Sequence, residues 1–237
     1  MPALVSRGFP LFPLGIVALP SERIPLHIFE DRYRRMIERC LAAAPGSLER
    51  EFGILWLSDD ELKDVGCACE IDAVLDRMDD GRLNILARGT RPFRLIERQD
   101  ELPYPAGVVE FLSDHDARDG GAGERVEGTS AEPGTPGEVG TPLQAGTPAD
   151  ARALYRELVE IATDRELSDD ELSLMDAYAM AATVEFGTDA KQELLELRSE
   201  PARLRLLATL LRTAIERLAV IDRAQARARS NGKVRFG

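Results

Sequence analysis

The chain has 237 residues, 44% of them hydrophobic, and carries a formal net charge of -12. This length and composition predict a globular protein with a sizeable core, built as one large domain or two small ones. The negative charge repels phosphate groups and anionic lipids, which argues against nucleic acid or a membrane as partner. We find neither a signal-peptide pattern nor an apolar run of the roughly 18 residues that span a bilayer, so we expect a cytoplasmic protein.

The first half of the chain carries the patterns of short strands. "FPLFPLGIVAL" is apolar but interrupted by prolines, which predicts an edge strand, and "FGILWLS" predicts a buried one. A hairpin is expected where "CACEIDAVLDRM" and "RLNILARG" flank Asp79, Asp80 and Gly81, because Asp-Gly supplies the positive φ angles of tight turns. Two further strands are predicted in "RPFRLIER" and "AGVVEFLS". Short antiparallel strands at this spacing predict a small barrel or a pair of packed sheets.

The stretch "PLHIFEDRYRRM" leads into a helix that we expect to begin at Glu30 or Asp31. His27 then lies at the turn before the helix. A catalytic pair of His27 with Glu30 would need a nucleophile or a bound metal, and the nearby sequence indicates neither. His115, the other histidine, is a weaker candidate still. The apolar positions of this helix share one face: Tyr33, Met36 or Ile37, and Cys40 or Leu41.

The three cysteines are too few and too scattered for a disulfide framework, so we expect them to be reduced. Cys67 and Cys69 alternate on one face of a predicted strand and could begin a metal site. No third or fourth ligand follows at a recognisable spacing. The sequence therefore predicts buried structural thiols, with no metal and no cofactor.

Residues 114–149 interrupt the apolar pattern with a segment rich in Gly, Pro, Thr and acidic residues. The triplet "GTP" recurs at Gly134, Gly140 and Gly146 without any apolar face. Such a composition cannot bury enough surface to offset its ordering entropy, so we expect a flexible spacer. It divides the chain into a β-rich part, residues 1–113, and a helical part, residues 150–237.

The helical part shows the helical period throughout. A first helix is expected over residues 150–165, and a second over 168–182, which opens with Ser168 and Glu171 in a capping-box pattern. The longest helix should begin near Pro201. Two apolar stripes carry these predictions: Leu154, Leu158 and Ile161 on the first helix, and Leu204, Leu207, Leu211, Ile215, Leu218 and Ile221 on the last.

The last helix is also strongly basic outside its stripe. Residues 197–237 hold ten Lys or Arg against three Asp or Glu, so the preceding residues carry a net charge of -19. One interpretation is a solvated helix that packs against an acidic body. The other is a docking face for an acidic partner, for which Arg212, Arg217 and Arg223 are the candidates.

The opening stretch "FPLFPLGIVALPSERIPLHIFEDRYRRMI" resembles the start of the Lon-protease N-terminal substrate-binding domain, with its L-P-L-F-P-L strand and its P-L-H-I-F-E and R-Y before a helix. "VGCACEI", "DGRLNILARGTRPFRL" and "PYPAGVVEFL" follow in the family's order, and the helical part is similar to its closing bundle. The resemblance implies an α+β fold. A small antiparallel β-barrel or twisted sheets with one helix would precede a helical bundle ending in a long helix.

The resemblance implies a non-catalytic module that binds unfolded or client proteins, and holds or delivers them for a separate protease or chaperone. A P-loop needs Lys followed by Ser or Thr, whereas Lys63, Lys191 and Lys233 precede Asp, Gln and Val. The family's Ser-Lys peptidase dyad cannot be placed either, so any peptidase label would be inherited from the family name.

We expect the peptide-binding groove at the junction of the β-rich and helical parts. Its candidate wall residues are Phe12, Phe29, Tyr33 and Trp56. Two other functional interpretations of the sequence remain possible. One is an enzyme or a metal- or small-ligand-binding protein on the same scaffold, and the other is a self-associating structural protein. The sequence leaves the oligomeric state undecided.

Overall fold

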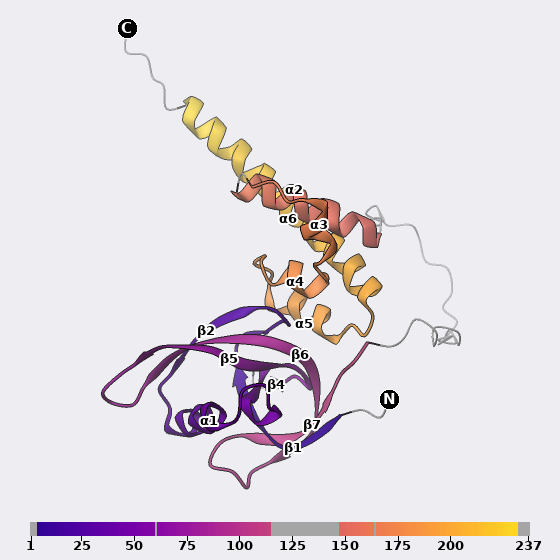
Figure 1. Cartoon of the computed structure of the whole chain (residues 1–237). Helices are drawn as coiled ribbons and strands as arrows, with labels where there is room; N and C mark the ends of the chain where they lie inside the picture. Colours follow the sequence, from indigo (N-terminus) through magenta and orange to yellow (C-terminus); the bar gives the residue numbers. More distant parts are fainter. Residues whose placement is uncertain (1–3, 60, 115–146, 164, 232–237) are drawn as a thin grey trace, which may run out of the picture.

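The computed structural model describes residues 4–59, 61–114, 147–163 and 165–231. It has the expected α+β architecture, with a β part (residues 4–114) below a helical part (residues 147–231) in Figure 1. The predicted spacer lies mostly outside the described residues. Its described ends are structured, since Asp114 is hydrogen-bonded to Arg203 and the first helix of the helical part begins at Pro148.

Seven strands form the sheet of the β part. The pairing order is β1-β7-β6-β5-β3-β4, β2 pairs with β6, and an additional parallel pairing joins β1 to β3. The strands β1, β7, β6, β5 and β3 therefore form a closed ring. Apart from the β1–β3 pair, every pairing among the described strands is antiparallel. The strands are β1 (Val5–Leu14), β2 (Arg23–Ile28), β3 (Glu51–Ser58), β4 (Glu61–Leu62), β5 (Val65–Arg77), β6 (Leu83–Gln99) and β7 (Ala106–Phe111).

The first strand, β1, is not the edge strand that its prolines predict. Its first half pairs with β7 and its second half, from Leu11 to Leu14, pairs with β3. Apart from Leu11, whose N–H also donates to the carbonyl of Pro105 beside β7, each half is bonded mainly along one side. Pro10 and Pro13 can therefore be accommodated where a missing N–H costs little. The strand that the sequence places at an edge is the one that closes the ring.

The predicted hairpin is confirmed, with Gly81 at φ 83° in the turn between β5 and β6. The two strands expected over residues 82–89 and 91–98 are one long strand, β6. It remains continuous because it changes partners along its length, from β2 and β5 to β7. At Gly89 the backbone of the segment before β2 crosses so closely that a Cβ would lie 2.0 Å from the carbonyl oxygen of Leu19.

Two apolar clusters hold the β part. One is contributed by all five ring strands and contains the edge-to-face rings of Phe9, Phe93 and Phe111. The other lies under helix α1 (Asp31–Ala42), which begins where expected and buries Tyr33, Met36, Ile37 and Cys40. A short 3-10 helix, η1 (Leu48–Arg50), connects α1 to β3. This second cluster continues into the helical part, so the two parts share a core.

The helical part is built around α6, along which α2 packs (Figure 1). The capping box at Ser168 and Glu171 is confirmed. The single helix expected over residues 168–182 is divided into two, because the Asp176 side chain accepts a hydrogen bond from the N–H of Ala179 and starts a new helix. The helices are α2 (Pro148–Thr163), α3 (Asp169–Ser173), α4 (Ala177–Ala181), α5 (Thr188–Glu196) and α6 (Glu200–Asn231).

The apolar stripe of α6 is buried at its start and opens toward its end. Leu204, Leu207 and Leu211 are buried, whereas Ile215 and Leu218 are half-buried. On α2 the buried face is Ala151, Tyr155 and Leu158, so the predicted Ile161 is exposed. The side chain of Ile221 lies outside the described part of the chain.

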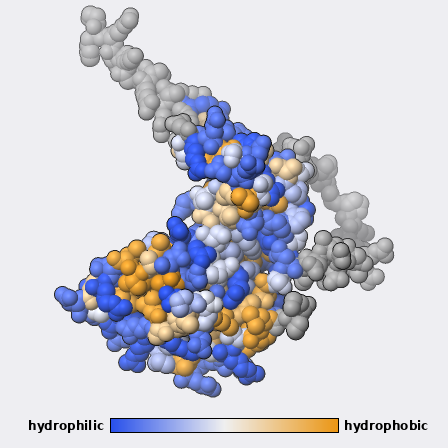
Figure 2. All heavy atoms as spheres, viewed as in Figure 1, coloured by the Kyte–Doolittle hydropathy of each residue, from blue (hydrophilic) through white to orange (hydrophobic). Residues whose placement is uncertain are grey.

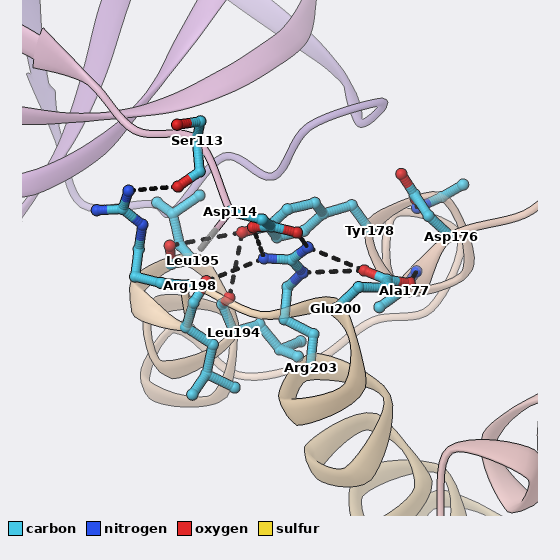
Figure 3. Close-up of polar contacts among 12 residues, drawn as sticks. Ser113, Asp114, Asp176, Ala177, Tyr178, Leu194, Leu195, Arg198, Glu200 and Arg203 are labelled. Carbon is cyan, nitrogen blue, oxygen red and sulfur yellow. Dashed lines mark hydrogen bonds and ion pairs between the residues drawn. The ribbon is translucent and has the colours of Figure 1, made fainter. Parts of the chain in front are cut away.

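Polar contacts fix the helical part to the β part (Figure 3). The Arg203 guanidinium donates to both carboxylate oxygens of Asp114, at 2.7 and 2.5 Å, and also to Glu200. It lies 4.5 Å above the ring of Tyr178, whose pKa burial raises to about 12. Because Asp114 is the last described residue of the β part, this cluster ties the end of that part to the base of α6. A second tie joins Lys191 to Glu22.

No helix in the described ranges has the length and hydropathy needed to cross a membrane.

Candidate functional site

An open groove of about 590 Å³ lies on the β part, where the ends of β1 and β2 meet the start of α1. Residues 12–16 form one wall and residues 25–30 the other, with α1 and the end of β3 between them. The walls follow from local sequence. The chain leaves β1 at Gly15, and it leaves β2 at Phe29 to enter α1 two residues later.

Buried aromatic rings form the floor of the groove. The rings of Phe12 and Tyr33 lie 4.2 Å apart between centroids, and Phe52 lies behind Phe12 at 6.3 Å. Burial, partly opposed by Arg32, raises the pKa of the Tyr33 hydroxyl, which therefore stays neutral at physiological pH. The floor is thus fixed and uncharged.

Three large apolar side chains on the rim face solvent. Ile16, Phe29 and Leu57 retain 39%, 60% and 40% of their accessible surface. Scattered apolar residues are normal on a protein surface, whereas a cluster of them around a concave apolar floor is typical of sites that bind apolar groups. Figure 2 shows the larger apolar patches on the β part, with smaller ones on the mostly polar helical part above it.

The polar residues of the groove are already paired with neighbours. The Nδ1 of His27 lies 2.7 Å from the Oδ1 of Asn84 on β6, and the His27 ring stacks on Phe29. Glu30 accepts a hydrogen bond from Arg32 at 2.9 Å. His27 and Glu30 are therefore engaged with other partners, which leaves the considered catalytic pair unformed.

The structure brings together three of the four predicted wall residues. Phe12 and Tyr33 form the floor and Phe29 the rim, whereas Trp56 is half-buried against the core and its neighbour Leu57 reaches the groove. The groove lies within the β part, away from the junction where we expected it. Ile16 was missed because its place in an apolar run reads as core, and only the turn at Gly15 hints that the chain leaves the strand there.

The predicted docking arginines are spread along α6. Arg212 is half-buried, while Arg217 and Arg223 are exposed. The Nε of Arg223 donates to the carbonyl of Ala219 in its own helix. His115 lies outside the described residues.

The cysteines are free and buried. Burial raises the pKa of Cys40 to about 11, and a hydrogen bond with Cys67 together with burial raises that of Cys69. The raised pKa values disfavour the reactive thiolate form of Cys40 and Cys69, and burial shields all three cysteines from solvent. Within the described ranges, no group of three or more His, Cys, Asp or Glu side chains is arranged to hold a metal ion.

A protein-family model, the ATP-dependent protease La (LON) substrate-binding domain, matches residues 8–213. The chain belongs to the Lon substrate-binding domain family. Two solved structures are similar to this Lon-type domain in fold. A Lon N-terminal domain protein from Xanthomonas campestris is 23% identical with a TM-score of 0.53, and covers 84% of this chain and 95% of its own. The N-terminal domain of the Mycobacterium avium complex Lon protease is 20% identical with a TM-score of 0.52, and covers 85% and 97%.

Proposed function

We propose that this Lon-type domain binds exposed apolar segments of other proteins in the groove between Gly15 and Phe29. The observation that carries the proposal is the exposed rim of Ile16, Phe29 and Leu57 around a buried aromatic floor. The groove volume of about 590 Å³ lies within the usual range for ligand pockets, about 300–1,000 Å³. A folded protein hides such segments in its core, so the groove would select unfolded or partly unfolded clients.

The groove is built to hold a ligand and offers no evident chemistry. The side chains of His27 and Glu30 are engaged with Asn84 and Arg32, and the floor contributes only rings. Within the 237 residues none of the three lysines stands before Ser or Thr, as a P-loop requires. We therefore propose a non-enzymatic role, in which the domain holds clients for, or delivers them to, a separate protease or chaperone. The three free thiols suit a reducing, cytoplasmic setting.

Binding of a short fluorescein-labelled peptide, in which Phe and Leu alternate with Ser, tests this proposal by fluorescence anisotropy. Gly15→Tyr should weaken binding about tenfold, because a Cβ at Gly15 meets no atom within 4 Å and the new ring fills the groove without disturbing the fold. Phe29→Ala should weaken it by a similar factor, since it removes the most exposed apolar side chain of the rim.

Leu75→Ala is the matched control, because Leu75 is 57% exposed on β5 and does not line the groove. It should bind the peptide as the wild type does. Equal affinity of the wild type and Gly15→Tyr for the peptide would refute the proposed site.

A further inference from the structure

A second, larger groove of about 930 Å³ lies in the helical part. Its walls are the second half of α2, the middle of α6, and the segment from Thr183 to Ala190 that leads into α5. It shares no residue with the groove of the β part. Its apolar lining includes Leu158, Val159, Val184, Phe186, Leu210 and Leu218.

The groove follows from the unequal lengths of its helices. α2 ends at Thr163, whereas α6 continues to Asn231 and runs past the end of α2 (Figure 1). The apolar stripe of α6 therefore extends beyond the part that α2 covers, and Leu218 on this stripe is only half-buried. On the opposite side, the hydroxyls of Tyr155 and Thr183 lie 2.8 Å apart and fix the third wall to α2. The groove is therefore preformed.

Charge is distributed unevenly around this groove. Glu185 and Asp189 are exposed on the wall that leads into α5, and within the described residues neither side chain forms an ion pair. Glu193 is exposed one turn further along α5. Of the two arginines at the groove, Arg165 is bound to Glu171 and Arg217 lies on the α6 wall. One wall therefore presents unneutralised carboxylates beside an apolar floor.

We propose that this groove docks a helical segment of a partner protein, with one apolar face and a Lys- or Arg-rich flank against Glu185 and Asp189. The helical form follows from the walls, because they offer no strand edge with which an extended peptide could pair its backbone. A helix satisfies its own backbone and packs between α2 and α6 as a further member of the bundle. The basic flank follows from the charges of the wall.

Two labelled synthetic peptides probe this site on the full chain, an amphipathic helix of Leu and Lys and its counterpart of Leu and Glu. The Leu/Lys peptide should bind at least tenfold more tightly than the Leu/Glu peptide, and its circular dichroism should become more helical on binding. Glu185→Lys with Asp189→Lys should abolish this preference.

Gly187→Tyr is the steric test. Gly187 lies in the groove wall with φ at -63°, and a Cβ there meets no atom within 4 Å, so the variant should fold normally and bind the Leu/Lys peptide at least tenfold more weakly. Gly15→Tyr, which blocks the other groove, should bind it as the wild type does.

Four results would overturn the proposal: unchanged binding by Gly187→Tyr, equal binding of the two peptides, no gain of helix, or loss of binding in Gly15→Tyr. Light scattering tests the alternative that a second copy of this chain occupies the groove. If the wild type dimerises and Gly187→Tyr is a monomer, the groove is filled by a second copy of this chain, and the proposed partner is wrong.

Discussion

The groove of the β part and the groove of the helical part arise in different ways. The first, of about 590 Å³, lies over packed aromatic rings, where two strands leave a closed sheet and their ends separate. The second, of about 930 Å³, has an apolar lining that is mainly aliphatic, and it lies where α6 extends beyond the end of α2. The first groove is thus smaller and has an uncharged floor, whereas the second is larger and has an acidic wall.

The two parts also differ in what holds them. In the β part the backbone approaches itself so closely that glycine is required, as at Gly89. In the helical part the side chains of a single stripe, such as Leu211, carry the packing. Added side-chain atoms should therefore destabilise the β part most, and the loss of apolar contacts should destabilise the helical part most.

Gly89→Ala should have the largest effect. Its Cβ would lie 2.0 Å from the backbone oxygen of Leu19, and a backbone atom cannot move aside as a flexible side chain can. We expect a loss of about 3 kcal/mol or more in the free energy of unfolding, measured by urea denaturation. Gly15→Ala, where a Cβ meets nothing within 4 Å, should change it by less than about 0.5 kcal/mol. A stable Gly89→Ala variant would show that this crossing is looser than described.

Leu211→Asp should destabilise the helical part by about 3 kcal/mol, because it buries a carboxylate without a partner. The matched variant Val220→Asp lies on the same helix at a position that is 58% exposed, and it should be close to neutral. Hydrogen exchange shows which elements Leu211→Asp destabilises. Protection should be lost in α2 and α6 first, and a loss confined to the strands would contradict the assigned packing.

Alkaline pH should weaken the β part before the helical part. The pKa of Cys40 is raised from 9.0 to about 11, so the folded thiol keeps a proton that the unfolded chain has already released. Stability is then complete below pH 9 and falls between pH 9 and 11, by about 1.4 kcal/mol per pH unit for this group. The corresponding window for Tyr178 in the helical part is pH 10 to 12. Cys40→Ala should flatten the first part of the decline, and an unchanged slope would contradict this cause.

Arg203→Met should loosen the junction and lower stability by about 2 kcal/mol. The Arg203 side chain is almost fully buried, but its partners Asp114 and Glu200 are partly exposed and can be rehydrated, which reduces the cost. Calorimetry should then show two transitions where the wild type shows one. A single unshifted transition would mean that the shared apolar core alone joins the two parts.

The smallest effect is expected for Arg212→Glu, Arg217→Glu and Arg223→Glu together. Exposed charge pairs are typically worth under about 1 kcal/mol each, so the midpoint of urea denaturation should change little. Unfolding of the triple variant would show that these arginines are structural. Arg212, the half-buried member, should account for most of any change.

Much of the fold could be predicted from local patterns. The Asp-Gly turn, the capping box at Ser168 and the apolar face of α1 depend on neighbours within a few residues, and all three are confirmed. The ring closure could not be predicted in this way. It depends on the parallel pairing of Leu11 with Gly53, more than forty residues away, and the prolines of β1 misleadingly favour an edge.

The candidate site was predicted only in part for the same reason. Phe12, Phe29 and Tyr33 lie close together in a motif, so the sequence could group them. Leu57 joins them only because β3 lies beside β1, and Trp56, the more conspicuous residue, packs away from the groove. The helical groove was not predicted, since it depends on where α2 ends relative to α6.

Site-specific photo-crosslinking tests the proposed function most directly. Phe29 and Leu75, which are 60% and 57% exposed, are each replaced by p-benzoylphenylalanine and irradiated with the labelled Phe/Leu/Ser peptide. We predict a strong crosslink from position 29, its loss when Gly15→Tyr is added, and little or none from position 75. Equal crosslinking at the two positions, or a crosslink at 29 that survives Gly15→Tyr, would contradict capture in this groove.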